Sequence, residues 1–157
     1  MWGLPLRKQT FNTVRFQPVT ACCNTDGHGA IQALLEKTTL QQQSILLLGA
    51  GGTASGIAAA LSKQAGDNQV HYYNRSSEKA TALALRHGGQ ALKTLPKTAQ
   101  FDIIISTLPP SAFDAPALLD QLAPLIRPNC TVMDVNYRPS VTPLLQLAQR
   151  QQATQVF

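Results

Sequence analysis

The segment SILLLGAGGTA, residues 44–54, joins a short aliphatic run to a turn rich in glycine. Ser44–Leu48 is a continuous apolar run, which is typical of a strand buried on both faces of a parallel sheet. Gly49–Thr53 interrupts the run, and Ala54–Gln64 then reads as a helix of small residues. The order strand, glycine turn, helix predicts the first unit of an open α/β fold.

The rest of the chain continues to alternate between strand and helix patterns. Strands are predicted over Gln69–Tyr73, Gln90–Leu92, Asp102–Ser106, Thr131–Val135 and Thr154–Phe157, and helices over Ser77–His87, Asp114–Leu125 and Thr142–Gln151. This spacing predicts a Rossmann-like, doubly wound parallel sheet of about six strands with helices on both faces. Pro116 and Pro124 are expected to disturb the register of their helix. Upstream, Phe11–Phe16 alternates like a strand, and the turn residues Thr25-Asp26-Gly27 precede a predicted helix over His28–Lys37.

The composition fits one folded domain. The 157 residues are 44% hydrophobic and 13% charged, with a formal net charge of +5. A chain of this length buries a core without disulfides or metals, and its apolar runs are too short to cross a membrane. No secretory signal is evident, so a cytoplasmic location is the default. The basic residues are scattered, so we expect no nucleic-acid partner and favour an anionic small molecule.

The cysteines and histidines show no ligand spacing, so no metal site is predicted. Cys22 and Cys23 are adjacent and form neither a CxxC pair nor a disulfide framework. His28, His71 and His87 are interpreted as structural or solvated residues.

The glycine turn carries the strongest chemical signal. It fits the pattern G-x-G-x-x-A in a strand–turn–helix setting. Gly49 permits the tight turn, Gly51 lets a pyrophosphate approach the backbone, and Ala54 lets the helix pack on the strand. The N–H groups at the helix start then hold the phosphates. The predicted dinucleotide contacts are Gly49, Ala50, Gly51, Gly52, Thr53 and Ala54. The alternative is a glycine-rich turn that binds nothing.

The end of the next strand indicates which dinucleotide is bound. NAD-binding domains usually place Asp or Glu there, whose carboxylate accepts from the ribose 2′-hydroxyl. Here the strand ends in Asn74-Arg75-Ser76-Ser77 without an acid. The planar guanidinium of Arg75 can pair with a 2′-phosphate, and its neighbours add donors. We therefore predict NADP as the cofactor, contacted by Asn74, Arg75, Ser76 and Lys79. The alternative is that Arg75 is a solvated charge.

Four segments together resemble the shikimate dehydrogenases. They are NTDGHG at 24–29, GAGGTA at 49–54, NRSSEKA at 74–80, and DVNYRP at 134–139 followed by TPLL at 142–145. Their order and approximate spacing are similar to that family over most of the chain. The resemblance implies an NADP-dependent oxidoreductase that interconverts 3-dehydroshikimate and shikimate in aromatic amino-acid biosynthesis.

The resemblance also implies roles for individual residues. Asp26 would be the catalytic-site carboxylate that hydrogen-bonds a substrate hydroxyl, and Asn12 would bind another hydroxyl. Thr107 matches a position near the nicotinamide end of the cofactor, and Tyr137 would lie close to the substrate. Plainer alternatives remain: Asp26 as a helix cap, Asn12 as a turn or strand-edge residue, and Tyr137 as a core residue.

The chain also departs from the family pattern. Family members carry an N-terminal substrate domain with a catalytic Lys, and a C-terminal helix with a substrate-binding Gln, and neither is found in these 157 residues. Residues 1–25 are interpreted as a remnant of the substrate-side segment, and residues 26–157 as the NADP-binding domain. Losing a general acid costs roughly 10²–10⁴-fold in rate, so we expect the chain alone to catalyse weakly. The surface facing the missing domain should be partly apolar, which favours self-association.

Two other functions stay open at this stage. One is a non-catalytic NADP-binding module, and the other is an oxidoreductase for another small substrate on the same fold. Asp26 favours the shikimate dehydrogenase interpretation, because a generic dehydrogenase needs no Asn-Thr-Asp-Gly at that position.

Overall fold

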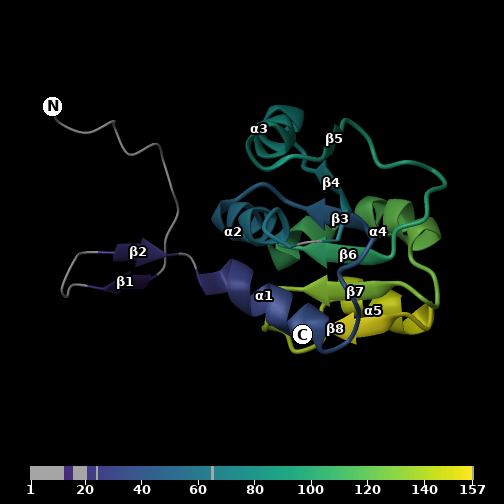
Figure 1. The fold of residues 1–157 in the computed structure, drawn as a ribbon. Coiled ribbons are helices and arrows are strands. Elements are labelled where there is room, and N and C mark those ends of the chain that lie inside the picture. The colour runs from purple at the N-terminus through teal and green to yellow at the C-terminus, as the bar shows by residue number, and fades with distance from the viewer. Residues whose placement is uncertain (1–12, 16–20, 24, 65, 157) are drawn as a thin grey trace, which may run out of the picture.

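A parallel sheet of six strands lies at the centre of the fold (Figure 1). The strand order is β5-β4-β3-β6-β7-β8. The strands are β3 (Ser44–Leu48), β4 (Gln69–Tyr73), β5 (Gln90–Leu92), β6 (Ile103–Ser106), β7 (Thr131–Asp134) and β8 (Thr154–Val156). This is a doubly wound order, in which the direction of the winding reverses between β3 and β6. The predicted fold class is confirmed.

We describe the fold from a computed structural model, which describes residues 13–15, 21–23, 25–64 and 66–156. In addition to the main sheet, β1 (Thr13–Arg15) and β2 (Ala21–Cys23) pair antiparallel. Among the described residues, no helix is both long and apolar enough to cross a bilayer.

Helices cover both faces of the sheet. They are α1 (Thr25–Leu35), α2 (Gly52–Leu61), α3 (Ser77–His87), α4 (Ala117–Leu122) and α5 (Pro143–Arg150), with 3-10 helices η1 (Pro110–Phe113) and η2 (Ala123–Leu125). Successive residues of β3 point to opposite faces: Ile45 and Leu47 pack under α1, α2 and α3, whereas Leu46 and Leu48 pack under η1, α4 and α5. All four side chains are fully buried, as the continuous apolar run predicted.

The helix predicted over Asp114–Leu125 is wrong as a single element. The chain instead forms η1, then α4, then η2. Pro116 occupies the N-cap position of α4, and Pro124 lies in the first turn of η2. Proline has no N–H and cannot continue a helix ladder, so each proline marks the start of a new short helix.

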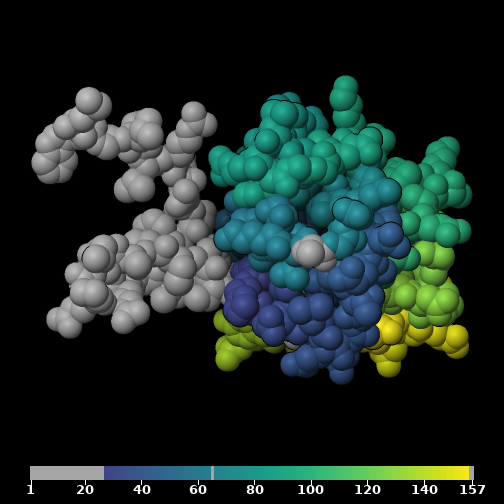
Figure 2. Space-filling view, in the orientation of Figure 1, coloured from purple at the N-terminus to yellow at the C-terminus, as the bar shows by residue number. Residues whose placement is uncertain are grey.

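The first long helix starts earlier than predicted. It begins at Thr25 rather than His28, so Thr25-Asp26-Gly27 forms its first turn instead of a preceding turn. Helices α1 and α2 lie side by side (Figure 2). Gly27 is buried at this contact, and a Cβ built on it would overlap the backbone carbonyl of Gly56 on α2. A glycine that reads as a turn signal in the sequence therefore serves helix packing.

Gly27 and Gly29 provide a matched test of this packing. Gly27→Ala is expected to lower the free energy of unfolding by about 1–3 kcal/mol, because the added methyl group forces two backbones apart. Gly29→Ala, two residues further along the same helix, meets nothing within 4 Å and should raise stability by up to about 1 kcal/mol. Urea unfolding of both variants checks this. Equal effects would show that the helix contact is looser than described.

Candidate functional site

The first residue of the glycine turn after β3 has a backbone conformation that favours glycine. Gly49 has φ +105°, and its N–H donates to the carbonyl of Tyr73 on the adjacent strand at 2.8 Å. A Cβ there would also collide with the hydroxyl of Thr107. That hydroxyl donates to the carbonyl of Leu48 at 2.9 Å. Gly49 and Thr107 are thus packed together at the carboxyl ends of β3 and β6.

The third residue of the turn faces open space. Gly51 is the N-cap of α2 and has an ordinary φ of −85°. A Cβ built on it meets nothing within 4 Å. The N-cap residue is a glycine and offers no capping side chain, and the first turn of α2 carries no acidic residue. The positive end of the helix therefore faces a space into which an anion can enter.

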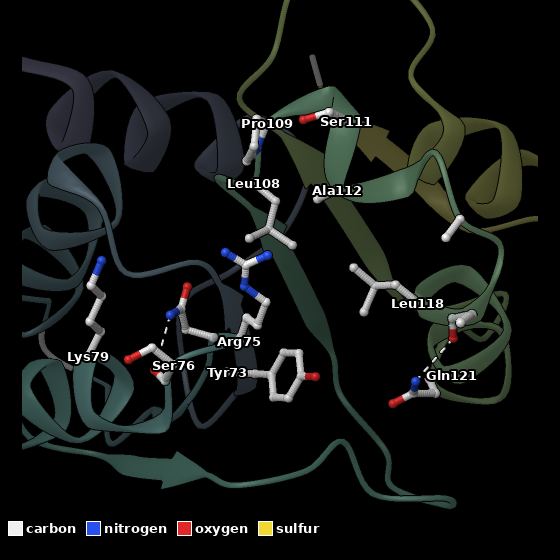
Figure 3. Close-up of a pocket in the computed structure, with 13 residues that line it drawn as sticks. Tyr73, Arg75, Ser76, Lys79, Leu108, Pro109, Ser111, Ala112, Leu118 and Gln121 are labelled. Atoms are coloured by element: carbon white, nitrogen blue, oxygen red, sulfur yellow. Dashed lines mark hydrogen bonds between the residues drawn. The ribbon is translucent and has the colours of Figure 1, made fainter.

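A first cavity of about 670 Å³ lies at the end of β4 (Figure 3). It brings together Asn74, Arg75, Ser76 and Lys79, all four of the residues predicted there. In Figure 3 the Arg75 side chain points from the strand end towards Leu108. The remaining lining residues come from β4, the segment after β6, η1 and α4: Tyr73, Leu108, Pro109, Ser111, Ala112, Ala115, Ala117, Leu118 and Gln121. One wall is thus cationic and polar, and the opposite wall is largely apolar.

Local hydrogen bonds arrange the polar wall of this first cavity. The Asn74 amide donates to the Ser76 carbonyl at 3.1 Å, and the Ser76 hydroxyl donates to Glu78 Oε2 at 2.7 Å. The bond from Ser76 lowers the pKa of the Glu78 carboxyl. A negative charge is therefore held at Ser76, one of the residues that line the cavity. Glu78 was not predicted as a site residue, because the acid of such sites is expected at the strand end, whereas Glu78 lies in the first turn of α3.

A second cavity, also about 670 Å³, lies beside α1 and the end of β7. It brings together three residues predicted for the site, Thr53, Thr107 and Tyr137. Tyr137 is 83% exposed, which excludes the alternative of a core residue. The guanidinium carbon of Arg138 lies 5.9 Å from the centre of its ring. The other lining residues are Gly29, Ala30, Ala33, Pro109, Met133, Asp134, Val135 and Asn136.

The other two residues predicted for the substrate side, Asn12 and Asp26, are not fully described. Asn12 lies outside the described residues. Asp26 lies in the first turn of α1, inside the helix rather than at its cap, and the structure describes its backbone only. The same helix contributes Gly29 and Ala30 to the second cavity.

Both cavities lie at the carboxyl ends of the central strands. Pro109, which follows β6, lines both of them. The glycine turn, the first cavity and the second cavity thus lie around the point where the strand order reverses. In open α/β sheets, ligands bind in the crevice at this switch point.

Comparison with known proteins places the chain in a family. The sequence model of the family described as Shikimate / quinate 5-dehydrogenase matches residues 32–113, slightly more than half of the chain. The chain belongs to this family. The resemblance recognised from the four segments is therefore confirmed, and two of them, residues 49–54 and 74–80, lie within the matched range.

Several shikimate dehydrogenases are similar to this chain. The shikimate dehydrogenase (NADP(+)) of Pyrococcus furiosus is 39% identical over 128 residues, which covers 80% of this chain and 45% of the relative. That of Methanothermobacter thermautotrophicus is 34% identical, covering 92% and 55%. The structure of the Thermus thermophilus enzyme in complex with NADP(H) and shikimate has a TM-score of 0.75 at 28% identity, covering 92% and 54%. The chain spans about half the length of these relatives.

Proposed function

We propose that these 157 residues form the NADP-binding half of a shikimate dehydrogenase. The observation that carries the proposal is the gathering of Asn74, Arg75, Ser76 and Lys79 around one cavity, next to a glycine turn with open space in front of it. The names of the similar proteins support NADP, since the curated relatives are NADP(+) enzymes and a solved relative is in complex with NADP(H) and shikimate.

The residues of the site fit such a cofactor. The open space before Gly51 and the positive end of α2 suit the pyrophosphate. The guanidinium of Arg75 suits the 2′-phosphate, with Ser76 and Lys79 as further donors. The second cavity, which Thr107 lines, lies on the other side of the switch point and suits the nicotinamide end.

The chemistry proposed for the whole enzyme is hydride transfer. The cofactor held by the glycine turn and Arg75 would supply a hydride acceptor, as NADP+, for oxidation of the shikimate hydroxyl, and a hydride donor, as NADPH, for reduction of the 3-dehydroshikimate ketone. We assign Asp26 to hydrogen-bond a substrate hydroxyl, and Asn12 to bind another hydroxyl. Tyr137, exposed at the rim of the second cavity, is assigned to the substrate side.

The domain division expected from the sequence is part of this proposal. Residues 26–157 contain the whole six-stranded sheet and its helices apart from Thr25, the first residue of α1, which supports one cofactor-binding domain. Leu35, Tyr137 and Val141 are large apolar side chains that are at least 38% exposed, and they support self-association or contact with a substrate domain. Analytical ultracentrifugation of the chain at several concentrations measures self-association.

A turnover assay tests the catalytic part of the proposal. The chain is mixed with NADP+ and shikimate, with and without the separate N-terminal substrate domain of a related shikimate dehydrogenase. Production of NADPH only when shikimate is present supports the proposed dehydrogenase activity. Binding of NADP+ with no turnover in either mixture would favour a non-catalytic NADP-binding module instead.

Glu78 is expected to limit affinity for the cofactor. Its carboxylate, which accepts the Ser76 hydroxyl, opposes the 2′-phosphate and competes for a donor. Glu78→Gln should therefore tighten NADP+ binding by about twofold to fivefold, in line with weak interactions between exposed charges. Titration calorimetry at low salt measures this, with Glu36→Gln at an exposed position just after α1 as the control. Weaker binding after Glu78→Gln would contradict the expected repulsion.

A further inference from the structure

A buried carboxylate lies at the end of β7, beside the second cavity. Asp134 is 1% exposed and lines that cavity. Its Oδ2 accepts the hydroxyl of Thr142 at 2.7 Å. Its Oδ1 accepts the backbone N–H of Asn136 at 3.0 Å and the Asn136 side-chain amide at 2.7 Å. Both oxygens are thus satisfied, as a carboxylate out of water requires.

The two partners of Asp134 connect it to two further segments. The Asn136 amide also donates to the carbonyl of Leu108 at 2.6 Å, which joins the segment after β7 to the segment after β6. Thr142 is fully buried, and its hydroxyl caps α5 by accepting the N–H of Leu145 at 3.4 Å. One carboxylate therefore holds both ends of the segment between β7 and α5.

The held segment supplies much of one wall of the second cavity. Val135, Asn136 and Tyr137 line it, together with Asp134. Leu108, the other anchor, lines the first cavity. A change at Asp134 is therefore transmitted to the second cavity first, while Arg75 and its neighbours lie on another strand end and make none of these bonds.

We propose that Asp134 is a positioning residue for the nicotinamide half of the dinucleotide. Through Asn136 and Thr142 it fixes residues 135–141 against the segment after β6 and so sets the shape of the second cavity. The inference rests on the proposed function, because it takes that cavity to receive the nicotinamide. It assigns no contact between Asp134 and the substrate.

A comparison of two ligands tests this role. NADP+ occupies both halves of the site, whereas 2′,5′-ADP carries the adenosine and 2′-phosphate without the nicotinamide. Asp134→Asn removes the charge and replaces one acceptor with a donor. We expect it to weaken NADP+ binding about tenfold, the loss that follows when about one charge-assisted hydrogen bond no longer positions the wall. Binding of 2′,5′-ADP should stay within about twofold.

Three further variants keep the test independent of folding. Thr142→Val removes the hydroxyl with little change of shape and should show the same split between the ligands, while Thr142→Ser should restore NADP+ binding. Val132→Ala, at a fully buried position of the same strand, provides a comparable loss of stability and should not separate the ligands. Titration calorimetry gives the affinities and thermal unfolding gives the stability.

The outcomes separate this inference from the proposed function. Selective loss of NADP+ affinity supports the positioning role. Equal loss for both ligands, or the same split in Val132→Ala, overturns it and leaves Asp134 as a structural residue. If the wild-type chain binds neither ligand, the proposed function itself fails and the inference falls with it.

Discussion

Replacement of Gly51 with valine is expected to abolish most NADP+ binding while the chain stays folded. The affinity should fall by at least about 100-fold, because the branched side chain fills the space through which a pyrophosphate reaches the start of α2. The fold should tolerate the change. The backbone at Gly51 has an ordinary φ of −85°, and a Cβ there meets nothing within 4 Å.

Titration calorimetry with NADP+ measures this effect, and thermal unfolding without ligand confirms the fold. Ser62→Ala, at the other end of the same helix, is the control and should leave binding unchanged. Gly49 is a poorer choice, because its φ of +105° and its contact with Thr107 would confound binding with folding. Unchanged affinity in Gly51→Val would mean that the glycine turn does not hold the pyrophosphate.

Replacement of Arg75 with glutamine is expected to remove the preference for NADP+. Hydrogen bonds to charged groups contribute about 1.5–3 kcal/mol, so NADP+ affinity should fall by about 10-fold to 150-fold. Binding of NAD+, which has no 2′-phosphate, should change little. Arg75 is exposed at the end of β4, so its replacement should not affect folding.

The control for Arg75 is Arg86→Gln, in the last turn of α3, the helix that follows Arg75. It removes an equal charge away from the first cavity and should leave both affinities unchanged at moderate salt, where distant exposed charges are screened. Equal losses for NADP+ and NAD+ in Arg75→Gln would contradict a specific 2′-phosphate contact.

Local sequence patterns explain why most of the fold could be predicted, both for β3, which is buried, and for β4 and β5, which are only partly buried. The predicted bounds of Ser44–Leu48, Gln69–Tyr73 and Gln90–Leu92 agree with the structure. In a doubly wound sheet the central strands must be apolar on both faces, and the turns between them need glycine or polar residues. These requirements are local, so they can be recognised in the sequence. Helix Ser77–His87 was also predicted with its observed bounds, because Gly88-Gly89 ends it.

Features that depend on distant partners could not be predicted in the same way. The role of Gly27 depends on the carbonyl of Gly56 on another helix. The role of Asp134 depends on Thr142, eight residues further along the chain, and on the Leu108 carbonyl reached through Asn136. From the sequence alone, a carboxylate at a strand end is expected to be exposed to solvent. Only the structure shows the hydrogen-bond donors that allow it to be buried. In the segment DVNYRP, the prediction singled out Tyr137 as a site residue. The hydrogen bonds that hold this segment are instead made by Asp134 and Asn136.

The residues that line the first cavity could be predicted better than the hydrogen bonds between them. Arg75, Ser76 and Lys79 lie together because they follow one strand, β4, and they face the segment after β6 because parallel strands end at the same edge of the sheet. The neighbouring Glu78 was not foreseen, because an acid was expected at the strand end and not in the first turn of the following helix. The roles of Asn12 and Asp26 stay predictions.

Thermal unfolding of the unmodified chain with NADP+, with NAD+ and without ligand tests the central claim most directly. Ligand at about 100 times its dissociation constant stabilises a protein by roughly 2.7 kcal/mol, which raises Tm by about 5–10 °C for a domain of this size. A rise of this order with NADP+ and a much smaller one with NAD+ at the same concentration is the predicted result. No rise with either dinucleotide would contradict the claim that the glycine turn and Arg75 form a working NADP site.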